Sequence, residues 1–414
     1  MKVLLVNKFH YIKGGSETYY FGLGELLKKS GYEVIYFSMR DEKNQPCEQE
    51  KYFVDNVDFN IPMGKWQIVK TALKMLYSFE AKKKFEQLIL DEKPDIIHLN
   101  IFQSQLTGSI VDVAHRYHIP VVYTAHDLKS VCPNYQMLNH GKICEKCVQG
   151  ICWNCFRTGC MKDSKLKSFL ATLEAYVYKM KKIYEKIDLI ITPSGFYKMK
   201  IKEADITCGT VIHMVNFLPK GTEYSASDKP GDYFLYFGRL SREKGILTLV
   251  KAYAQTKVER PLYIVGTGPI KGQIEQLVKD LKLEEKIKLL GFVQGQKLKE
   301  IVRKSLCVCL PSEWYENCPY SIMEAMAAGK PAIVSSNGGL PELVENGING
   351  FVSIPGNSDS LAEYIQKMDT ESAAKLNKMS NAAMEKAQKI FDNDQYVKEL
   401  TFLYQGLLKR KVNE

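Results

Sequence analysis

Short apolar runs, each followed by a longer stretch of helical periodicity, recur along most of this 414-residue chain. Such runs are rich in β-branched residues, which is typical of parallel strands that are buried on both faces of a sheet. Parallel strands need a crossover between them, usually a helix, so the pattern predicts an α/β protein with doubly wound parallel sheets. The predicted strands are Lys2–Val6, Glu33–Phe37, Ile96–Asn100, Pro120–Ala125, Leu189–Thr192, Tyr233–Phe237, Leu262–Val265, Ile287–Leu290, Cys307–Leu310 and Pro331–Val334.

The strand and helix pattern stops once and then restarts. The interruption is Lys220–Gly231, whose Gly, Ser, Asp, Lys and Pro residues are typical of a linker. We therefore expect two Rossmann-like domains that face each other across a cleft, residues 1–220 and residues 221–390. The last segment, residues 391–414, reads as a helix that we expect to pack back on the first domain.

Composition narrows the class of protein. The chain is 45% hydrophobic and 25% charged, as in ordinary globular proteins, and no apolar run is long enough for a transmembrane helix. Its first residues do not resemble a secretion signal, so we expect a cytoplasmic protein. Of the net charge of +10, most falls within residues 1–220. A basic first half fits phosphate-bearing substrates, an anionic membrane or a simply solvated surface.

Two features of the first half stand where a strand ends. Gly14 and Gly15 follow the first strand and open a helix, so backbone N–H groups there can meet a phosphate. Taken alone, the glycines favour a simple tight turn over a phosphate site. His126 follows the strand that ends at Ala125, where its ring can hydrogen-bond a sugar or a phosphate, or can be a core histidine bonded to backbone.

The second half has a basic strand end. Arg239 and Lys244 follow Tyr233–Phe237, and open α/β sheets bind ligands outside the carboxyl ends of their strands. One guanidinium fork and one ammonium suit a diphosphate, whose charge needs neutralising when it leaves. Because cations are common on protein surfaces, these two residues do not identify a diphosphate site by themselves.

A pair of glutamates brackets a predicted helix start. Pro319 is a natural first helical residue, which places the N–H groups of Tyr320 and Ser321 at a helix N-terminus. Glu316 stays in the preceding loop. Glu324 lies five residues after Pro319, or about 7–8 Å along the helix axis. This offset can place its carboxylate on ribose hydroxyls while the helix start holds the phosphates. The alternative for Glu324 is a solvated helix residue, which its apolar neighbours disfavour.

Together these motifs resemble the GT-B glycosyltransferases, in particular the large retaining family four (group 1). The resemblance covers nearly the whole chain, and the combination is far more specific than any single motif. Pro319 departs from the family pattern, in which many members have glycine. The motifs are Gly-Gly-Ser-Glu at 14–17, Gly-Arg-Leu-Ser-x-x-Lys-Gly at 238–245, Val-Gly-x-Gly-Pro at 265–269, Gly-Phe-Val at 291–293, the glutamates at 316 and 324, Gly-Leu-Pro-Glu at 339–342 and Asn-Gly-x-Asn-Gly-Phe at 346–351.

The resemblance implies a role for each residue. The glycine loop, Arg239 and Lys244 would meet the diphosphate, Glu324 the ribose, and backbone near Val293 the base. Glu316, with the backbone of the next two residues, would hold the donor sugar, which His126 would contact from the first domain. The implied catalytic set is His126, Arg239, Lys244 and Glu316, and the implied donor-binding set is Gly14, Gly15, Arg239, Lys244, Gly266, Val293, Asn317, Cys318, Tyr320, Ser321 and Glu324.

The implied reaction is transfer of a sugar, with retention, from a nucleotide-diphosphate donor to a glycan or a polyprenyl-diphosphate-linked glycan in surface or capsule polysaccharide synthesis. A UDP-sugar is the default donor, by family frequency. Retention would come from front-face attack assisted by the departing diphosphate, and no catalytic divalent metal is expected. The rivals are a GT-B epimerase, which needs no acceptor, a phosphorylase, for which no lysine suits pyridoxal phosphate, and a non-catalytic nucleotide-sugar sensor.

Cysteines gather within residues 132–160, which hold six of the eleven. Two Cys-x-x-Cys pairs fit a structural zinc site, although free thiols and a disulfide stay open. The segment also resembles an insert of family members that act on surface polysaccharides. That match implies Cys144, Cys147, Cys155 and Cys160 as zinc ligands and leaves Cys152 over. The neighbouring enzyme motifs disfavour a zinc ribbon for nucleic acid, so we expect the insert to shape the acceptor pocket.

Two basic amphipathic segments, Gly64–Gln87 and Lys165–Lys186, combine apolar residues with several lysines. Helices of this kind either lie on anionic membranes or pack on a protein core. The pattern alone favours packing on a core. Because enzymes of the resembled family often extend lipid-diphosphate-linked sugars, we expect reversible association with the inner face of the plasma membrane, and no nucleic-acid partner.

Overall fold

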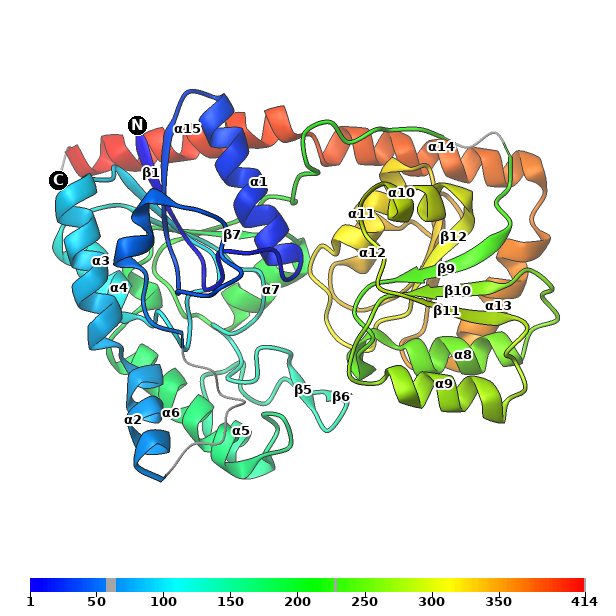
Figure 1. The fold of residues 1–414 in the computed structure, drawn as a ribbon, viewed down its shortest axis with the longest axis horizontal. Coiled ribbons are helices and arrows are strands. Elements are labelled where there is room, and N and C mark those ends of the chain that lie inside the picture. The colour runs from blue at the N-terminus through cyan, green and yellow to red at the C-terminus, as the bar shows by residue number, and fades with distance from the viewer. Residues whose placement is uncertain (57–64, 227–228, 413–414) are drawn as a thin grey trace. The chain divides into compact units, whose positions relative to one another are not determined.

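The computed structural model describes the backbone of residues 1–56, 65–226 and 229–412. The chain forms two compact units. The first contains Met1–His140, Cys144–Asn216 and Asn393–Glu414, and the second contains Gly141–Ile143 and Phe217–Asp392. Each unit is built around one six-stranded sheet (Figure 1).

The sheet of the first unit is entirely parallel, with the strand order β2-β1-β3-β4-β7-β8. Its central strands are mostly apolar and almost entirely buried, as the sequence predicts for a sheet covered on both faces. Chain order reverses between β1 and β3, so the ends of these two strands open the crevice in which ligands bind in such sheets. The strands are β1 (Lys2–Val6), β2 (Glu33–Phe37), β3 (Ile96–Leu99), β4 (Val121–Thr124), β7 (Leu189–Thr192) and β8 (Thr210–His213).

The sheet of the second unit is also parallel, with the order β11-β10-β9-β12-β13-β14. This is the order of a Rossmann fold, and chain order reverses between β9 and β12. The prediction of two doubly wound parallel sheets is therefore confirmed. The strands are β9 (Tyr233–Phe237), β10 (Leu262–Val265), β11 (Ile287–Gly291), β12 (Ser305–Leu310), β13 (Ala332–Ser335) and β14 (Gly350–Ser353).

Four strands lie outside those predicted from sequence. β8 and β14 are the outer strands of the two sheets, and β5 (Leu138–Asn139) pairs with β6 (Lys142–Ile143) in a small hairpin. β8 and the hairpin strands are mostly half-buried or exposed, and β14 is buried but only four residues long with a glycine and a serine at its ends, so these four strands lack the continuous apolar run by which the other strands were predicted.

Helices cover the sheets. In the second unit α8, α9 and α13 form one layer, and α11 and α14 lie on the opposite face of the sheet (Figure 1). The first unit holds α1 (Gly15–Lys29), α2 (Lys65–Leu76), α3 (Phe79–Glu92), α4 (Ser109–Arg116), α5 (Trp153–Thr158), α6 (Lys165–Met180), α7 (Gly195–Glu203) and α15 (Asn393–Val412). The second holds α8 (Ile246–Ala254), α9 (Lys271–Asp280), α10 (Gly295–Lys304), α11 (Tyr320–Ala327), α12 (Leu340–Leu343), α13 (Ser358–Thr370) and α14 (Ala373–Ile390).

The final helix, α15, packs against α1 within the first unit (Figure 1). Two of its tyrosines donate or accept hydrogen bonds in the core. The hydroxyl of Tyr396 lies 2.6 Å from that of Tyr19, and the hydroxyl of Tyr404 lies 2.5 Å from Nδ1 of His98. The last helix of the chain thus completes the core of the first unit.

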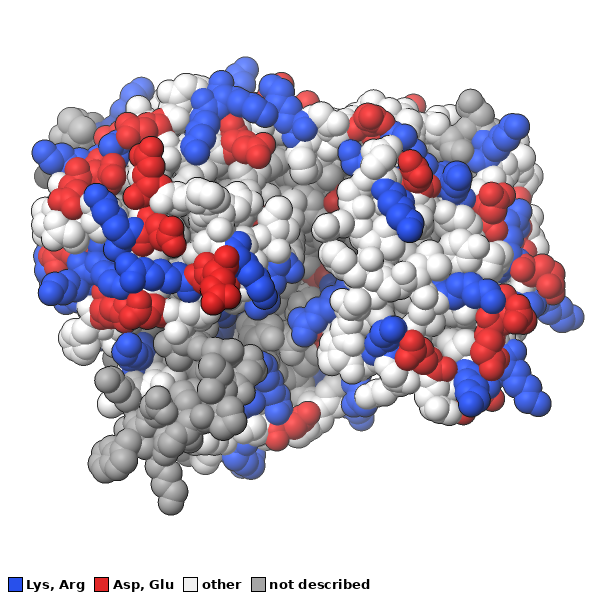
Figure 2. Space-filling view, viewed as in Figure 1, with Lys and Arg blue, Asp and Glu red and all other residues white. Residues whose placement is uncertain are grey.

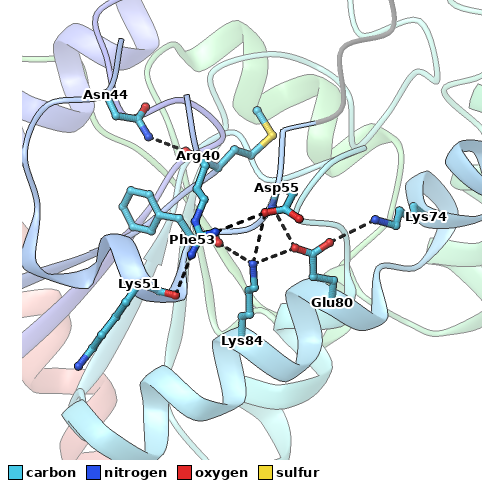
Figure 3. A network of polar contacts seen from close by, with 9 residues as sticks. Arg40, Asn44, Lys51, Phe53, Asp55, Lys74, Glu80 and Lys84 are labelled. Atoms are coloured by element: carbon cyan, nitrogen blue, oxygen red, sulfur yellow. Dashed lines mark hydrogen bonds and ion pairs between the residues drawn. The ribbon is translucent and has the colours of Figure 1, made fainter. Parts of the chain in front are cut away.

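A polar network holds the start of α3 to the chain after β2 (Figure 3). Glu80 accepts hydrogen bonds from the Asp55 backbone N–H at 3.0 Å, from Lys84 at 2.9 Å and from Lys74 at 3.2 Å. Burial alone would raise the pKa of Glu80, but these donors more than offset it and the pKa is lowered. The carboxylate therefore stays charged and ties the segment around Asp55 to the helix.

Charge is mixed on the face drawn in Figure 2, where basic and acidic side chains alternate over both units. Of the two basic segments expected to be amphipathic, Gly64 and the side chains of Lys65–Lys70 lie outside the described residues. The second segment forms α6, whose residues Ser168, Ala171 and Tyr178 are buried while Leu166 and Met180 are exposed. Within the described ranges, no helix is both long and apolar enough to cross a membrane.

Candidate active site

The basic strand end of the second unit lies at the reversal of chain order between β9 and β12. Arg239 follows β9 directly and is exposed. Lys244 ends the short helical turn Arg242–Lys244, and its ammonium lies 5.1 Å from the ring of Trp314. Both cations therefore lie where a Rossmann-type sheet binds its ligand.

The loops around this strand end are in close contact. Gly266 follows β10 with φ +140°, and a Cβ there would stand 1.9 Å from the carbonyl oxygen of Gly238. Only glycine allows this approach without displacement of the loop. Gly266 is thus explained by the packing of two loops against each other, a structural reason that the sequence alone did not supply.

Glu316 is buried, at 4% exposure. Its Oε1 accepts a hydrogen bond from Lys244 at 2.6 Å and another from the Ser312 hydroxyl at 2.5 Å. The backbone carbonyl of Glu316 accepts a bond from Gly339 N–H at 2.8 Å, and a Cβ on Gly338 would stand 2.1 Å from that carbonyl. The structure therefore joins Lys244 and Glu316, 72 residues apart, in one rigid arrangement.

The helix after Glu316 begins one residue later than predicted. Pro319 has an extended backbone, φ −74° and ψ 126°, and is the N-cap of α11, which runs from Tyr320 to Ala327. The prediction that Pro319 is the first helical residue is wrong by one position. Cys318 is buried with its thiol 3.5 Å from the sulfur of Met323, so its backbone, more than its side chain, is suited to a ligand.

Glu324 faces a cavity of about 240 Å³ in the second unit. The neighbouring residues Met323 and Ala325 are buried, whereas the carboxylate itself is exposed to the cavity. The surrounding walls desolvate this carboxylate and raise its pKa to about 7, and Lys299 opposes that shift. The wall of the cavity also includes Gly295, two residues beyond Val293.

In the first unit, the glycine loop leads straight into α1. Gly14 is the N-cap, and its φ of −171° is extended backbone that any residue adopts. A Cβ on Gly14 would meet only Glu17, at an ordinary 3.8 Å. The protein itself therefore does not require glycine at position 14. Glu17 is buried and accepts hydrogen bonds from Asn7 at 3.2 Å and Ser16 at 2.9 Å.

His126 is fixed by two neighbours. Its Nε2 donates to Oδ1 of Asn100 at 2.9 Å, and its ring meets the edge of Tyr19 with the centroids 4.8 Å apart. Burial lowers the pKa of His126 to about 3, so the imidazole is neutral at physiological pH. A neutral ring in this position suits hydrogen bonding to a sugar better than carrying a proton.

Behind His126, a chain of hydrogen bonds runs to α15. The hydroxyl of Thr124 lies 2.7 Å from Nε2 of His98 and 3.2 Å from the hydroxyl of Tyr19. Tyr396 and Tyr404 close the chain from α15. The final helix thus supports the residues that hold the His126 ring.

The cysteine segment is only partly assembled as predicted. The sulfurs of Cys155 and Cys160 lie 3.3 Å apart because Gly159 ends α5 in the left-handed conformation and turns the chain back, which joins Cys160 N–H to the Cys155 carbonyl. This contact lowers the pKa of Cys160 to about 6. Cys147 belongs to the same buried cluster, and its thiol interacts with that of Cys132.

The predicted zinc ligands therefore do not all meet. Among the residues that the structure describes, no group of three or more His, Cys, Asp or Glu side chains is placed to hold a metal ion. Cys144 is half-buried, follows the β5–β6 hairpin and is not part of the Cys147–Cys155–Cys160 cluster. The turn that ends α5 explains the contact between Cys155 and Cys160, and it does not explain the spacing of the other cysteines.

Sequence reasoning missed the residues that orient the predicted ones. Asn100 follows β3 and Ser312 follows β12, so the same strand-end rule that found His126 would have found both. Lys299 on α10 and Tyr19 on α1 carry no such signal, because only the fold brings them beside Glu324 and His126.

Comparison with known proteins assigns both halves of the chain. Residues 13–213 match the family described as Glycosyltransferase Family 4, and residues 222–386 match Glycosyl transferases group 1. The fold is that of sucrose-phosphate synthase from Thermosynechococcus elongatus, with a TM-score of 0.73 and 20% identity over 99% of each chain. HepE of Anabaena, solved with UDP, has a TM-score of 0.69 and 19% identity over 98% of this chain and 100% of its own.

Sequence relatives agree with this class. An uncharacterized glycosyltransferase of Methanocaldococcus jannaschii is 34% identical over 173 residues, which is 41% of this chain and 44% of that protein's length. A putative colanic acid biosynthesis glycosyltransferase of Escherichia coli is 25% identical over 57% of this chain and 61% of its own. The chain is a glycosyltransferase with the GT-B fold. Its first half is similar to the family 4 model and its second half to the group 1 model.

Proposed function

We propose that this enzyme transfers a sugar, with retention, from a nucleotide-diphosphate donor to a glycan acceptor in the synthesis of a surface polysaccharide. The observation that carries the proposal is the Lys244–Glu316 pair, which lies where chain order reverses between β9 and β12. Glu324 lies on α11, the helix that follows Glu316. A cation, a buried carboxylate and a cavity carboxylate in this order match the parts of a nucleotide sugar: diphosphate, sugar and ribose.

Each residue has a stated task in this proposal. Arg239, Lys244 and the start of α11 neutralise the diphosphate as it leaves, because preorganised cations and helix N-termini stabilise developing negative charge. Glu316 accepts hydrogen bonds from sugar hydroxyls while Lys244 and Ser312 hold its orientation. Glu324 accepts from the ribose hydroxyls. These side chains need no divalent metal for charge neutralisation.

The first unit supplies the acceptor side, and Gly14, Gly15 and the neutral ring of His126 complete the donor site. With His126 neutral and no acid–base carboxylate pair proposed, the departing diphosphate takes the acceptor's proton on the face it leaves, which preserves the anomeric configuration. UDP is the proposed nucleotide, in keeping with the UDP complexes of HepE. The acceptor is a glycan, including one linked to a lipid diphosphate at an anionic membrane.

Donor turnover tests this function. Slow hydrolysis of a nucleotide sugar without acceptor should be lost in Arg239→Ala and Glu316→Ala and retained in a surface control, Lys251→Ala. An epimerase would instead convert the donor sugar with no acceptor and no free UDP. A non-catalytic sensor would bind donor and release no UDP under any condition.

Zinc in the cysteine segment is a separate proposal with its own test. Protein purified under reducing conditions should contain close to one zinc per chain, held through thiolates that include Cys155 and Cys160. Less than about 0.2 zinc per chain would overturn it, since structural zinc binds tightly at neutral pH.

A further inference from the structure

A second cavity, of about 310 Å³, lies wholly within the first unit. Its walls are residues near Lys129–Pro133 and Cys147–Cys152, the second half of α6, the chain that follows α6, and the turn after α7. This volume is within the range of small-molecule sites. None of the residues assigned above to the donor lines it, so the proposed function leaves it unused.

One wall is a buried ion pair whose charges are already satisfied. Lys129 lies 2.9 Å from Glu174, with side-chain exposures of 9% and 3%. Lys129 also donates to the carbonyl of Pro133 at 2.9 Å, and Ser104 donates to Glu174 at 3.1 Å. Because both charges are paired and also hydrogen-bonded to neighbours, this ion pair fixes the shape of the wall and does not attract a further ion.

One lining residue, Ser130, carries a hydroxyl beneath the cavity surface. The oxygen of Ser130 is buried and, within the described part of the chain, has no hydrogen-bond partner. A buried hydroxyl left in this state is energetically unfavourable. A ligand that brings its own hydroxyl removes this cost.

The charge of the lining selects the kind of ligand. Three lysines face three acidic residues, so the wall is formally neutral, and Lys182 is itself paired with Glu185 at 3.2 Å. A diphosphate would require an excess of cations. A neutral ligand with many hydroxyls suits the hydroxyl and amide groups and the apolar surface between them. The charged lining residues are Lys129, Lys179, Lys182, Glu174, Glu185 and Asp205.

The cavity is close in sequence to a residue assigned to the donor sugar. Its first wall residue, Lys129, comes three residues after His126, on the same loop beyond β4. We propose that this cavity binds a sugar residue of the glycan acceptor, next to the one that receives the transferred sugar. This inference rests on the proposed glycosyltransfer, and it assigns acceptor recognition to the cysteine segment and α6.

Filling the cavity tests the assignment. Ala175 on α6 lines it, so Ala175→Phe should block it, and Met180→Phe places the same aromatic side chain at an exposed position of the same helix. Ser130→Ala removes the unpartnered hydroxyl. The probes are the methyl glycosides of glucose, galactose, mannose and N-acetylglucosamine, with lactose and pyrophosphate, observed by saturation-transfer NMR.

The expected result is that at least one sugar probe binds the unmodified enzyme and Met180→Phe, and that its Kd rises at least tenfold in Ala175→Phe and a few-fold in Ser130→Ala. Unchanged sugar binding in Ala175→Phe, no sugar binding at all, or displacement of the sugar by pyrophosphate would each overturn the inference. A UDP thermal shift is measured on the same variants. Loss of that shift in every protein, unmodified enzyme included, would count against the donor site and not against this cavity.

Discussion

Lys244→Met should destabilise the second unit more than any other single change of a lysine at the site. At 2.6 Å and an effective dielectric constant of about 20, the attraction between Lys244 and Glu316 is roughly 6 kcal/mol. Desolvation of both charges offsets part of this. Removing the lysine alone leaves a 5%-exposed carboxylate without its cation, which costs about 3–5 kcal/mol.

The double variant separates this effect from simple loss of packing. Glu316→Gln keeps the shape and the bond from Ser312, so Lys244→Met combined with Glu316→Gln should recover about half of the lost stability or more. Lys251→Met, at an exposed position of α8, should change stability by less than about 0.5 kcal/mol. Recovery of stability in the double variant should not restore donor turnover.

Urea unfolding gives the measurement. Trp314 is the tryptophan of the second unit, so fluorescence in a Trp66→Phe, Trp153→Phe background reports on that unit by itself. A loss below about 1 kcal/mol in Lys244→Met would refute the reasoning. So would a double variant that is no more stable than Lys244→Met alone.

Three further predictions concern titration and the final helix. UDP affinity should fall as the pH drops below about 7, by up to tenfold per unit, because a proton competes with ribose for Glu324, and Glu324→Gln should flatten this profile in calorimetry. Burial lowers the pKa values of His98 and His126 to about 3, so below pH 6.5 the folded state binds fewer protons than the unfolded state. The free energy of unfolding should therefore decline as the pH falls below about 6.5. An NMR titration that gives His126 a pKa near 6.5 would contradict this. Tyr404→Phe strands the buried His98 Nδ1 and should cost about 1–3 kcal/mol in urea unfolding, whereas Phe402→Leu, at an exposed position, should cost little.

The central strands were predictable because burial on both faces demands continuous apolar runs. Lys2–Val6, Leu189–Thr192 and Tyr233–Phe237 were predicted with the bounds that the structure has. The edge strand Gly350–Ser353 is short and carries a glycine and a serine, so the same rule does not find it. The end of each central strand then locates the site, which is why His126 and Arg239 could be singled out from sequence.

Contacts made across the fold could not be predicted. The bond between Lys244 and Glu316 depends on the adjacency of β9 and β12, and nothing in the spacing of the two residues indicates it. The cysteine spacing was compatible with zinc and with a helix-ending turn. The structure shows that the turn explains the contact between Cys155 and Cys160.

The central claim is that the second unit binds a nucleotide diphosphate through Arg239 and Lys244. The most direct measurement is a thermal-shift series with UDP, GDP, dTDP and ADP, in which a ligand at a hundredfold excess over its Kd contributes about 2.7 kcal/mol of stability. The account predicts a clear rise in Tm with one of the four, UDP first, and its loss in Arg239→Ala. No shift with any of the four, or an equal shift in Arg239→Ala, would contradict it.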